Sequence, residues 1–252
     1  MTAAPSALAN GEDIFVFHQG YADNGQLWFT HTQDPLLWFG DMQAPNLSMS
    51  ESPSAVLYNG QTYIFHQGGG NNGQLWYTVF DANGWEPDTQ IQNLRMSNSP
   101  SAVAWAGGIT VFYQGANNNG QLSYTYSPDG ATWGGDTLVP VLALTDSPSA
   151  VVYNGLLYVF HQGGGNEGRL RYAVYDGTNW SADIPLNIAM SGSPSAVVWA
   201  GGITVFHQGN GDGHLWYTYS PDGTNWGPDT LIQSAESGNF VGITDSASAV
   251  VF

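Results

Sequence analysis

Two short motifs recur along the chain and carry most of the side chains that could recognise a ligand. One is His-Gln-Gly, with Tyr-Gln-Gly as a variant, and the other is Gly-Gln-Leu-Trp with its variants. Imidazole, amide and indole groups hydrogen-bond neutral hydroxyls and stack against apolar ring faces, which is the chemistry of sugar recognition. The candidate sugar-binding residues, in chain order, are His18, Gln19, Gln26, Trp28, His66, Gln67, Gln74, Trp76, Tyr113, Gln114, His161, Gln162, His207, Gln208 and Trp216.

Each candidate type also has a structural interpretation. The imidazoles, replaced by Tyr113 in one repeat, could equally brace neighbouring repeats through hydrogen bonds or contact a sugar. For the glutamines, whose recurrence is strict, a bracing role is favoured. The position of the Trp holds Ser123 and Arg171 in two repeats, so we expect that it is not fully buried. A loose packing contact between blades and a sugar-binding platform are equally favoured for this position. One imidazole per repeat gives no tetrahedral cluster, so neither a metal nor another cofactor is expected.

The motifs lie inside an internal repeat that runs through the whole sequence. The segment SPSAVLYNGQTYIFHQG and its variants begin, at spacings of 46 to 48 residues, at Ala4, Ser52, Ser99, Ser147 and Ser193. A fragment of one more copy begins at Ser246. We therefore expect a single domain, residues 1–252, built from repeats 4–51, 52–98, 99–146, 147–192 and 193–245 and a closing strand, 246–252.

Each repeat is expected to form four short strands, because β-branched or aromatic runs alternate with clusters of Gly, Asn, Asp and Pro. Asn59-Gly60, Asn72-Gly73 and Asp176-Gly177 are typical of tight hairpin turns. No segment has the period of an amphipathic helix. Four antiparallel strands in about 47 residues predict an all-β protein, a β-propeller with five blades. Residues 5–9 and 246–252 are both copies of a first strand, so we expect that one replaces the other in the first blade or that the chain belongs to a larger ring.

The order of the strands places the candidate motifs on one face. If the first strand of each blade is innermost, the Ser-Pro-Ser start, the His-Gln-Gly end of the second strand and the Gln-Leu-Trp start of the third meet at one rim. In the second repeat Leu75 and Tyr77 alternate with Trp76, so we expect the first two in the core. Asp129 and Asp222 belong to turns on the opposite face, where their carboxylates shape the turn.

The composition excludes several classes of partner. The 252 residues include 20 Asp and Glu, no Lys and only three Arg (Arg95, Arg169 and Arg171), for a formal net charge of −17. Nucleic acid and anionic membranes both need clustered cations, so neither is expected as a partner. No apolar run is long enough to cross a bilayer, and a homo-oligomer remains open. The chain has no Cys and begins with MTAAPSALAN, which lacks the features of a Sec signal, so we expect a cytoplasmic protein or one released by a non-classical route.

The acidic residues do not single out a catalytic centre. Many recur in turns, such as Asp81 and Asp129, or along outer loops, such as Asp88 and Asp136. A glycoside hydrolase needs two or three unlike carboxylates at one centre, which would break the symmetry of the repeats. Repeated, near-equivalent pockets suit a multivalent binder, so we expect no enzymatic activity. The alternatives are a propeller glycoside hydrolase and a scaffold for protein partners, whose candidate surface is the non-repeated loop 234–244.

The repeat SPSAVVYNGxxYVFHQG, followed by NGQLWYT and DGxxW, resembles the blade repeat of bacterial β-propeller lectins of the Photorhabdus lectin family, over essentially the whole chain. This resemblance implies a lectin without enzymatic activity or metal that binds L-fucose and O-methylated sugars in pockets between blades. It places the contacts at the His-Gln and Gln-Leu-Trp positions. Members of that family usually have seven blades, whereas this chain holds five repeats, and Ser123 and Arg171 replace the rim Trp in two of them.

Overall fold

The computed structural model describes residues 3–34, 36–234, 238–243 and 246–249. Almost all of its regular structure is antiparallel strand, as predicted, and the only helical element in the described part is one 3-10 turn, η1 (Tyr21–Asp23). Within the same residues, no helix has the length and apolar character needed to span a bilayer.

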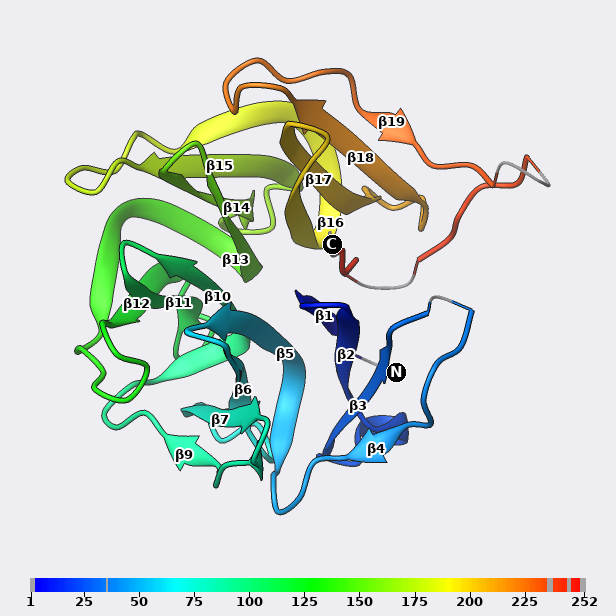
Figure 1. Cartoon of the computed structure of the whole chain (residues 1–252). Coiled ribbons are helices and arrows are strands. Elements are labelled where there is room, and N and C mark those ends of the chain that lie inside the picture. Colours follow the sequence, from blue (N-terminus) through cyan, green and yellow to red (C-terminus); the bar gives the residue numbers. More distant parts are fainter. Residues whose placement is uncertain (1–2, 35, 235–237, 244–245, 250–252) are drawn as a thin grey trace.

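The strands follow one another in groups around a central axis, and we number these groups blades 1 to 5 (Figure 1). Blade 1 consists of β1 (Ser6–Asn10), β2 (Asp13–Gln19), β3 (Leu27–Thr32) and β4 (Met42–Gln43). Blade 2 consists of β5 (Met49–Tyr58), β6 (Gln61–Gly68), β7 (Leu75–Asp81), β8 (Gly84–Trp85) and β9 (Thr89–Gln90), with both β8 and β9 paired to β7.

Blades 3 to 5 are hydrogen-bonded into one continuous series of strands. Its members are β10 (Met96–Trp105), β11 (Gly108–Gly115), β12 (Gln121–Ser127), β13 (Thr137–Tyr153), β14 (Leu156–Gly163), β15 (Arg169–Tyr175), β16 (Ile184–Trp199), β17 (Gly202–Gly209), β18 (Leu215–Ser220) and β19 (Thr230–Leu231). The long strands β13 and β16 each begin at the outer edge of one blade and end as the inner strand of the next, because they pair first with the strand before them and then with the strand after.

The turn chemistry of the sequence explains the tightest hairpins. Asn59 and Gly60 both have positive φ, 50° and 78°, as a two-residue turn between β5 and β6 requires. Asp176-Gly177 also lies in a short hairpin turn, closed by the antiparallel bridge between Tyr175 and Trp180, in which the backbone N–H of Asp176 donates to the carbonyl of Asn179 (3.3 Å). Asn72-Gly73 lies in a longer loop between β6 and β7, so the turn prediction is confirmed for Asn59-Gly60 and Asp176-Gly177.

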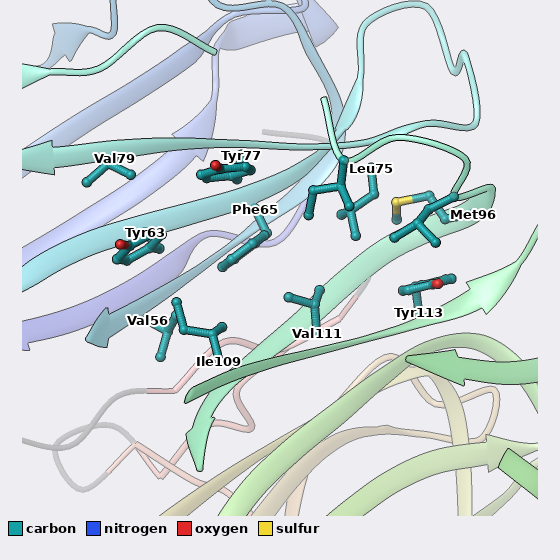
Figure 2. Packing of buried hydrophobic residues seen from close by; sticks show 12 residues of the cluster. Val56, Tyr63, Phe65, Leu75, Tyr77, Val79, Met96, Ile109, Val111 and Tyr113 are labelled. Carbon is teal, nitrogen blue, oxygen red and sulfur yellow. The ribbon is translucent and has the colours of Figure 1, made fainter. Parts of the chain in front are cut away.

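The core lies between neighbouring blades. Leu75 and Tyr77 of β7 are buried, as their alternation predicts, and they pack in a cluster that continues into blade 3 with Val111 and Tyr113 (Figure 2). A Trp from the outer part of each following blade closes this interface. Trp133 packs edge-on against Phe65 of blade 2, with ring centroids 5.3 Å apart.

The same packing recurs from blade to blade. Trp85 approaches Phe17 and Phe29 of blade 1, and Trp180 approaches Phe112 of blade 3 in the same way. Trp226 lies 5.4 Å from Phe160 of blade 4. These tryptophans are therefore structural, and each depends on the blade before its own.

Serine hydroxyls join the inner strands around a central channel of about 190 Å³. The Oγ of Ser99 accepts a hydrogen bond from the backbone N–H of Ser52 (2.9 Å), and the Oγ of Ser54 accepts one from Ala102 (2.9 Å). The two bonds link blades 2 and 3 in opposite directions, and the same pair of bonds recurs between blades 3 and 4 and between blades 4 and 5.

The segment 246–249 takes a sixth place at this channel. Ser246 accepts a hydrogen bond from the backbone of Ser193 (3.2 Å), and Ala249 donates one to Ser195 (3.1 Å), as an inner strand of a next blade would. The strand β1 is paired with β2 at the same time. The prediction that one copy of the first strand replaces the other is therefore wrong in the described residues, and the larger ring stays a prediction. Residues 250–252 of the predicted closing strand lie outside the described residues.

The sixth place holds an inner segment without outer strands in the described part of the chain (Figure 1). Side chains that are packed elsewhere are consequently exposed beside it. Trp38, the counterpart of Trp133 in blade 1, is 48% exposed. Trp199 of blade 5 is 59% exposed, whereas its counterpart Trp105 packs against Tyr175 of the next blade.

Candidate functional site

A pocket of about 590 Å³ opens at the outer part of blade 2, where three segments that are distant in sequence meet. Ser48 comes from the link that precedes β5, Asn72 and Trp76 come from the start of β7, and Asp88 lies between β8 and β9. Its walls thus combine an indole ring, an amide, a hydroxyl and a carboxylate.

The carboxylate of Asp88 is held in place from inside the blade by His66. The imidazole is fully buried, its Nδ1 donates to the backbone carbonyl of Gln67 (3.0 Å), and its Nε2 lies 3.0 Å from Oδ1 of Asp88. His66 and Trp76 are cross-strand partners on β6 and β7, so the pair lies directly beside the indole. This arrangement fixes the carboxylate through one of its oxygens, and Asp88 itself lines the pocket.

The same His–Asp contact recurs in blades 1, 4 and 5 with an almost constant sequence separation. His18 pairs with Asp41, His161 with Asp183 and His207 with Asp229, over nitrogen-to-oxygen distances of 2.9 to 3.1 Å. In blade 3 the hydroxyl of Tyr113 donates to Asp136 over 2.8 Å. Burial, together with the neighbouring carboxylate, raises the pKa of Tyr113, so this hydroxyl keeps its proton and donates at any physiological pH.

The sequence analysis missed these aspartates. Each lies 22 or 23 residues after the His or Tyr that it pairs with, so the constant spacing was a usable signal. Asp88 and Asp136 were instead expected along outer loops, because the segments that carry them have no regular hydrophobic pattern. Asn72 and Ser48 of the blade 2 pocket gave no separate signal.

The exposure of the platform position differs among the blades. Trp28, Trp76 and Trp216 are half-buried, as expected, whereas Ser123 is buried, so the expectation that this position is not fully buried is wrong in blade 3. In blade 4, Nε of Arg171 donates to Oδ2 of Asp183 over 2.7 Å, and an Nη donates to Glu167 over 3.1 Å.

These bonds fix the charge state of Asp183 as well as its position. Burial alone raises the pKa of Asp183, but the hydrogen bonds and charges of His161 and Arg171 outweigh burial and hold that pKa below its usual value. Asp183 is therefore a carboxylate with both oxygens occupied by side chains of its own blade.

Three of the seven predicted glutamines brace adjacent blades. The side-chain amide of Gln114 donates to the carbonyl of Leu144 in blade 4 (3.2 Å), and Gln19 and Gln208 make the equivalent bonds to Met49 and Ile243. Gln67 also lines a second pocket of about 600 Å³ on the rim between blades 2 and 3. Loops after the second strands meet the starts of inner strands there, as the strand order predicts, whereas Trp76 at the start of the third strand lines the separate outer pocket.

The structure places the predicted site residues in two layers. The rings of His66, His161 and His207 are buried with both nitrogens in hydrogen bonds, so they reach a pocket only through their aspartates. The half-buried side chains of Gln26 and Gln74 lie in the loop that precedes the platform. Gln162 is buried. A role of all these residues in sugar binding stays a prediction.

In the part of the chain that the structure describes, no three His, Asp or Glu residues gather in a way that could hold an ion.

The prediction that Asp129 and Asp222 form turns is confirmed. The carboxylate of Asp129 accepts hydrogen bonds from the backbone N–H groups of Ala131 and Thr132. The carboxylate of Asp222 accepts them from Thr224 and Asn225.

Comparison with known proteins gives matches to solved structures only. No family model matches the chain, and no curated protein matches it. A mutant of the Aleuria aurantia lectin in complex with Fucα1-6GlcNAc is 16% identical with a TM-score of 0.70, over 98% of this chain and 85% of that one. AofleA from Arthrobotrys oligospora is 17% identical with a TM-score of 0.73, over 98% of this chain and 73% of that one.

Glycoside hydrolases share the fold as well. An α-L-arabinofuranosidase from Clostridium thermocellum is 16% identical with a TM-score of 0.60, over 97% of this chain and 95% of that one. One solved Aleuria aurantia lectin structure is described as a six-bladed β-propeller. The chain therefore has the β-propeller fold, which it shares with solved fucose-specific lectins and with sugar-cleaving enzymes.

Proposed function

We propose that this protein is a multivalent lectin that binds neutral sugars, such as L-fucose or O-methylated sugars, without cleaving them. The observation that carries the proposal is the blade 2 pocket, where the indole of Trp76 adjoins the fixed carboxylate of Asp88 and the amide of Asn72. A pyranose presents an apolar face that stacks on an aromatic ring and hydroxyls that need such polar partners.

Repetition of the site supports multivalency. We infer that the five sequence repeats form five blades of four strands in one domain, so that a Trp platform with a His–Asp pair recurs at fixed places around the ring, in blades 1, 2 and 5. Binding of one glycan branch then raises the effective concentration of the next, and weak single sites give strong overall binding. The fucose-specific lectins among the matched structures favour this class of ligand.

A glycoside hydrolase is the second candidate, favoured by the hydrolases that share the fold and by one local feature. Glu86 and Asp88 both line the blade 2 pocket, and no other blade has an acidic residue at the position of Glu86. A pair of carboxylates is the minimum for glycoside hydrolysis. Release of a chromogenic leaving group from aryl glycosides, abolished by Glu86→Gln, would establish this activity in place of simple binding.

A glycan array tests the lectin proposal. Labelled protein is applied to an array that includes fucosylated and O-methylated sugars, and binding is repeated with free monosaccharide as competitor. We expect competable binding to a narrow class of neutral sugars, and Trp76→Ala should weaken it while the melting temperature changes little. Absence of any competable signal would exclude a lectin and direct attention to the loop 234–244 as a surface for a protein partner.

A further inference from the structure

We propose that Arg171 closes the outer pocket of blade 4 by taking the carboxylate oxygen that a sugar hydroxyl uses in blades 2 and 5. In each open site, Oδ2 of the aspartate, Asp88 or Asp229, accepts a hydrogen bond from the sugar. Blade 4 binds no sugar. This inference rests on the proposed lectin function and deepens it, because it states which blades bind and through which atom.

The open site is seen in blade 2. His66 occupies Oδ1 of Asp88, and the carboxylate is 13% exposed at the wall of the pocket. Among the residues that the structure describes, no donor is bonded to Oδ2 of Asp88. A carboxylate oxygen beside an indole is suited to accept hydrogen bonds from sugar hydroxyls, and bonds to a charged acceptor are stronger than those between neutral groups.

The closed site in blade 4 uses the same backbone geometry. A Cβ placed on Gly68 would lie 2.6 Å from Nε1 of Trp76, and one placed on Gly163 would lie 2.8 Å from Cδ of Arg171. Trp76 and Arg171 thus both lie against the equivalent glycine of their blade. The side chain of Arg171 in blade 4 therefore occupies the place that the indole of Trp76 occupies in blade 2. There it donates to Oδ2 of Asp183, the atom that corresponds to the unbonded oxygen of Asp88.

A second substitution completes the closure. Glu167 stands four residues before Arg171, where blade 2 has Asn72, and it accepts hydrogen bonds from Arg171 through both carboxylate oxygens, at 3.1 and 3.2 Å. The guanidinium is therefore neutralised by two carboxylates and is not available to an acidic ligand. Removing it from Asp183 would leave a largely buried carboxylate without its partner, so a weak ligand does not displace it.

The ligand class follows from the charges of the open pocket. Its lining includes Asp88 and Glu86 and no Lys or Arg. An acidic sugar would meet like charge there, whereas a neutral sugar supplies both hydroxyl donors for Asp88 and an apolar face for Trp76. We therefore expect neutral hydroxylated rings and not sialic or uronic acids.

Exchange of the two residue pairs between blades tests the proposal. Glu167→Asn with Arg171→Trp should open blade 4, and Asn72→Glu with Trp76→Arg should close blade 2. Both designs reproduce a combination that already exists in another blade of this chain, and melting temperatures close to wild type show that they fold. Binding is followed by fluorine NMR of protein labelled with 5-fluorotryptophan, using the monosaccharide that competes on the array, with methyl α-L-fucoside first.

We expect the resonances of Trp76 and Trp216 to shift on saturation in the wild type. The Trp introduced at position 171 should add one more shifting resonance, and the blade 2 exchange should leave Trp216 responsive. The proposal is overturned if sugar binds but Trp76 and Trp216 do not respond, or if the folded blade 4 variant gives a new resonance that sugar leaves unchanged.

A matched pair of aspartate substitutions tests the anchor itself. Asp88→Asn should weaken binding at blade 2 about tenfold or more, because a charged acceptor is lost. Asp183→Asn disturbs the equivalent His–Asp pair in the closed blade and should leave sugar affinity unchanged. Equal weakening by both variants would contradict the proposal, whereas a wild-type protein that binds no sugar on the array would refute the lectin function itself.

Discussion

The buried imidazoles show how one residue type serves packing and recognition together. His66 lies in the blade interior, yet its contact with Asp88 sets the position of a carboxylate at the pocket wall. Tyr113 in blade 3 keeps a donor to Asp136 but lacks the second ring nitrogen. The recurring feature is therefore a buried donor to an aspartate, and histidine is the commoner way to supply it.

Replacement of His66 by Phe should lower the free energy of unfolding. The substitution fills the same space but removes the partner of Asp88, which is 13% exposed, and we expect a loss of about 3 kcal/mol in the free energy of unfolding. His18→Phe is the control, because its partner Asp41 is 49% exposed and can be hydrated. Denaturant titration measures the free energy of unfolding of both variants. An equal decrease in His66→Phe and His18→Phe would show that burial of the His66–Asp88 pair does not matter for stability.

Acid should weaken the turns that contain Asp129 and Asp222. Hydrogen bonds from backbone N–H groups, of Thr132 at Asp129 and of Asn225 at Asp222, hold the pKa of each carboxyl below its usual 3.8. A group with a lowered pKa in the folded state stabilises the protein above its unfolded-state pKa, and this contribution is lost as the pH falls below about 4. The melting temperature of Asp129→Asn should therefore fall less than that of wild type between pH 6 and pH 3.

Parallel acid dependence of the two proteins would contradict this reasoning. Asp81 and Asp176 accept similar turn hydrogen bonds, so the Asp129→Asn variant should still lose some stability in acid. The comparison of slopes, and not of absolute melting temperatures, is the relevant measurement.

At the level of strands, alternation made the core side of β7 predictable, because Leu75 and Tyr77 recur at the same phase in every repeat. The pairing of Asp88 was harder to foresee. The segment between β8 and β9 has little regular pairing, so no periodicity marks which of its residues turns inward. The contact between Arg171 and Asp183 was hard to predict for a related reason. Asp183 lies just before β16 and contacts Arg171 of β15 only once the chain has folded.

The interface between blades predicts a contrast between equivalent tryptophans. Trp133 packs against Phe65 and Tyr77 of the preceding blade, so Trp133→Ala should reduce the free energy of unfolding by about 3 kcal/mol or more. Trp38→Ala should cost less than about 1 kcal/mol, because Trp38 is 48% exposed beside the sixth place. Similar losses in denaturant titrations would show that Trp38 has a partner in solution.

Over the whole molecule, the blades are tied together by serine hydroxyls at the channel. The Oγ of Ser147 accepts the backbone N–H of Ser99, which has no alternative acceptor in the ladder because the strand is irregular there. The sequence showed that Ser-Pro-Ser recurs, but the function of the hydroxyls depends on contacts between residues nearly 50 positions apart and needed the structure.

Ser147→Ala should therefore cost about 1 to 2 kcal/mol in unfolding free energy, the penalty for an unsatisfied buried N–H. Ser52→Ala is a matched control, because the equivalent hydroxyl in blade 2 accepts no bond from blade 1 among the described residues. Urea titration of both variants should separate them, and indistinguishable midpoints would contradict the role assigned to Ser147.

Among the described residues the sixth place holds the segment 246–249 without outer strands, so blades 1 and 5 each have a full blade on one side only. Opening of a blade inside the ring breaks packing on both sides, whereas opening of blade 1 or blade 5 breaks full blade packing on one side only. Amide protons of β2 and β17 should consequently exchange with deuterium faster than those of β11 and β14, although the four strands are equivalent in sequence. The course of unfolding is thus set by position in the ring and proceeds from its two ends toward blade 3.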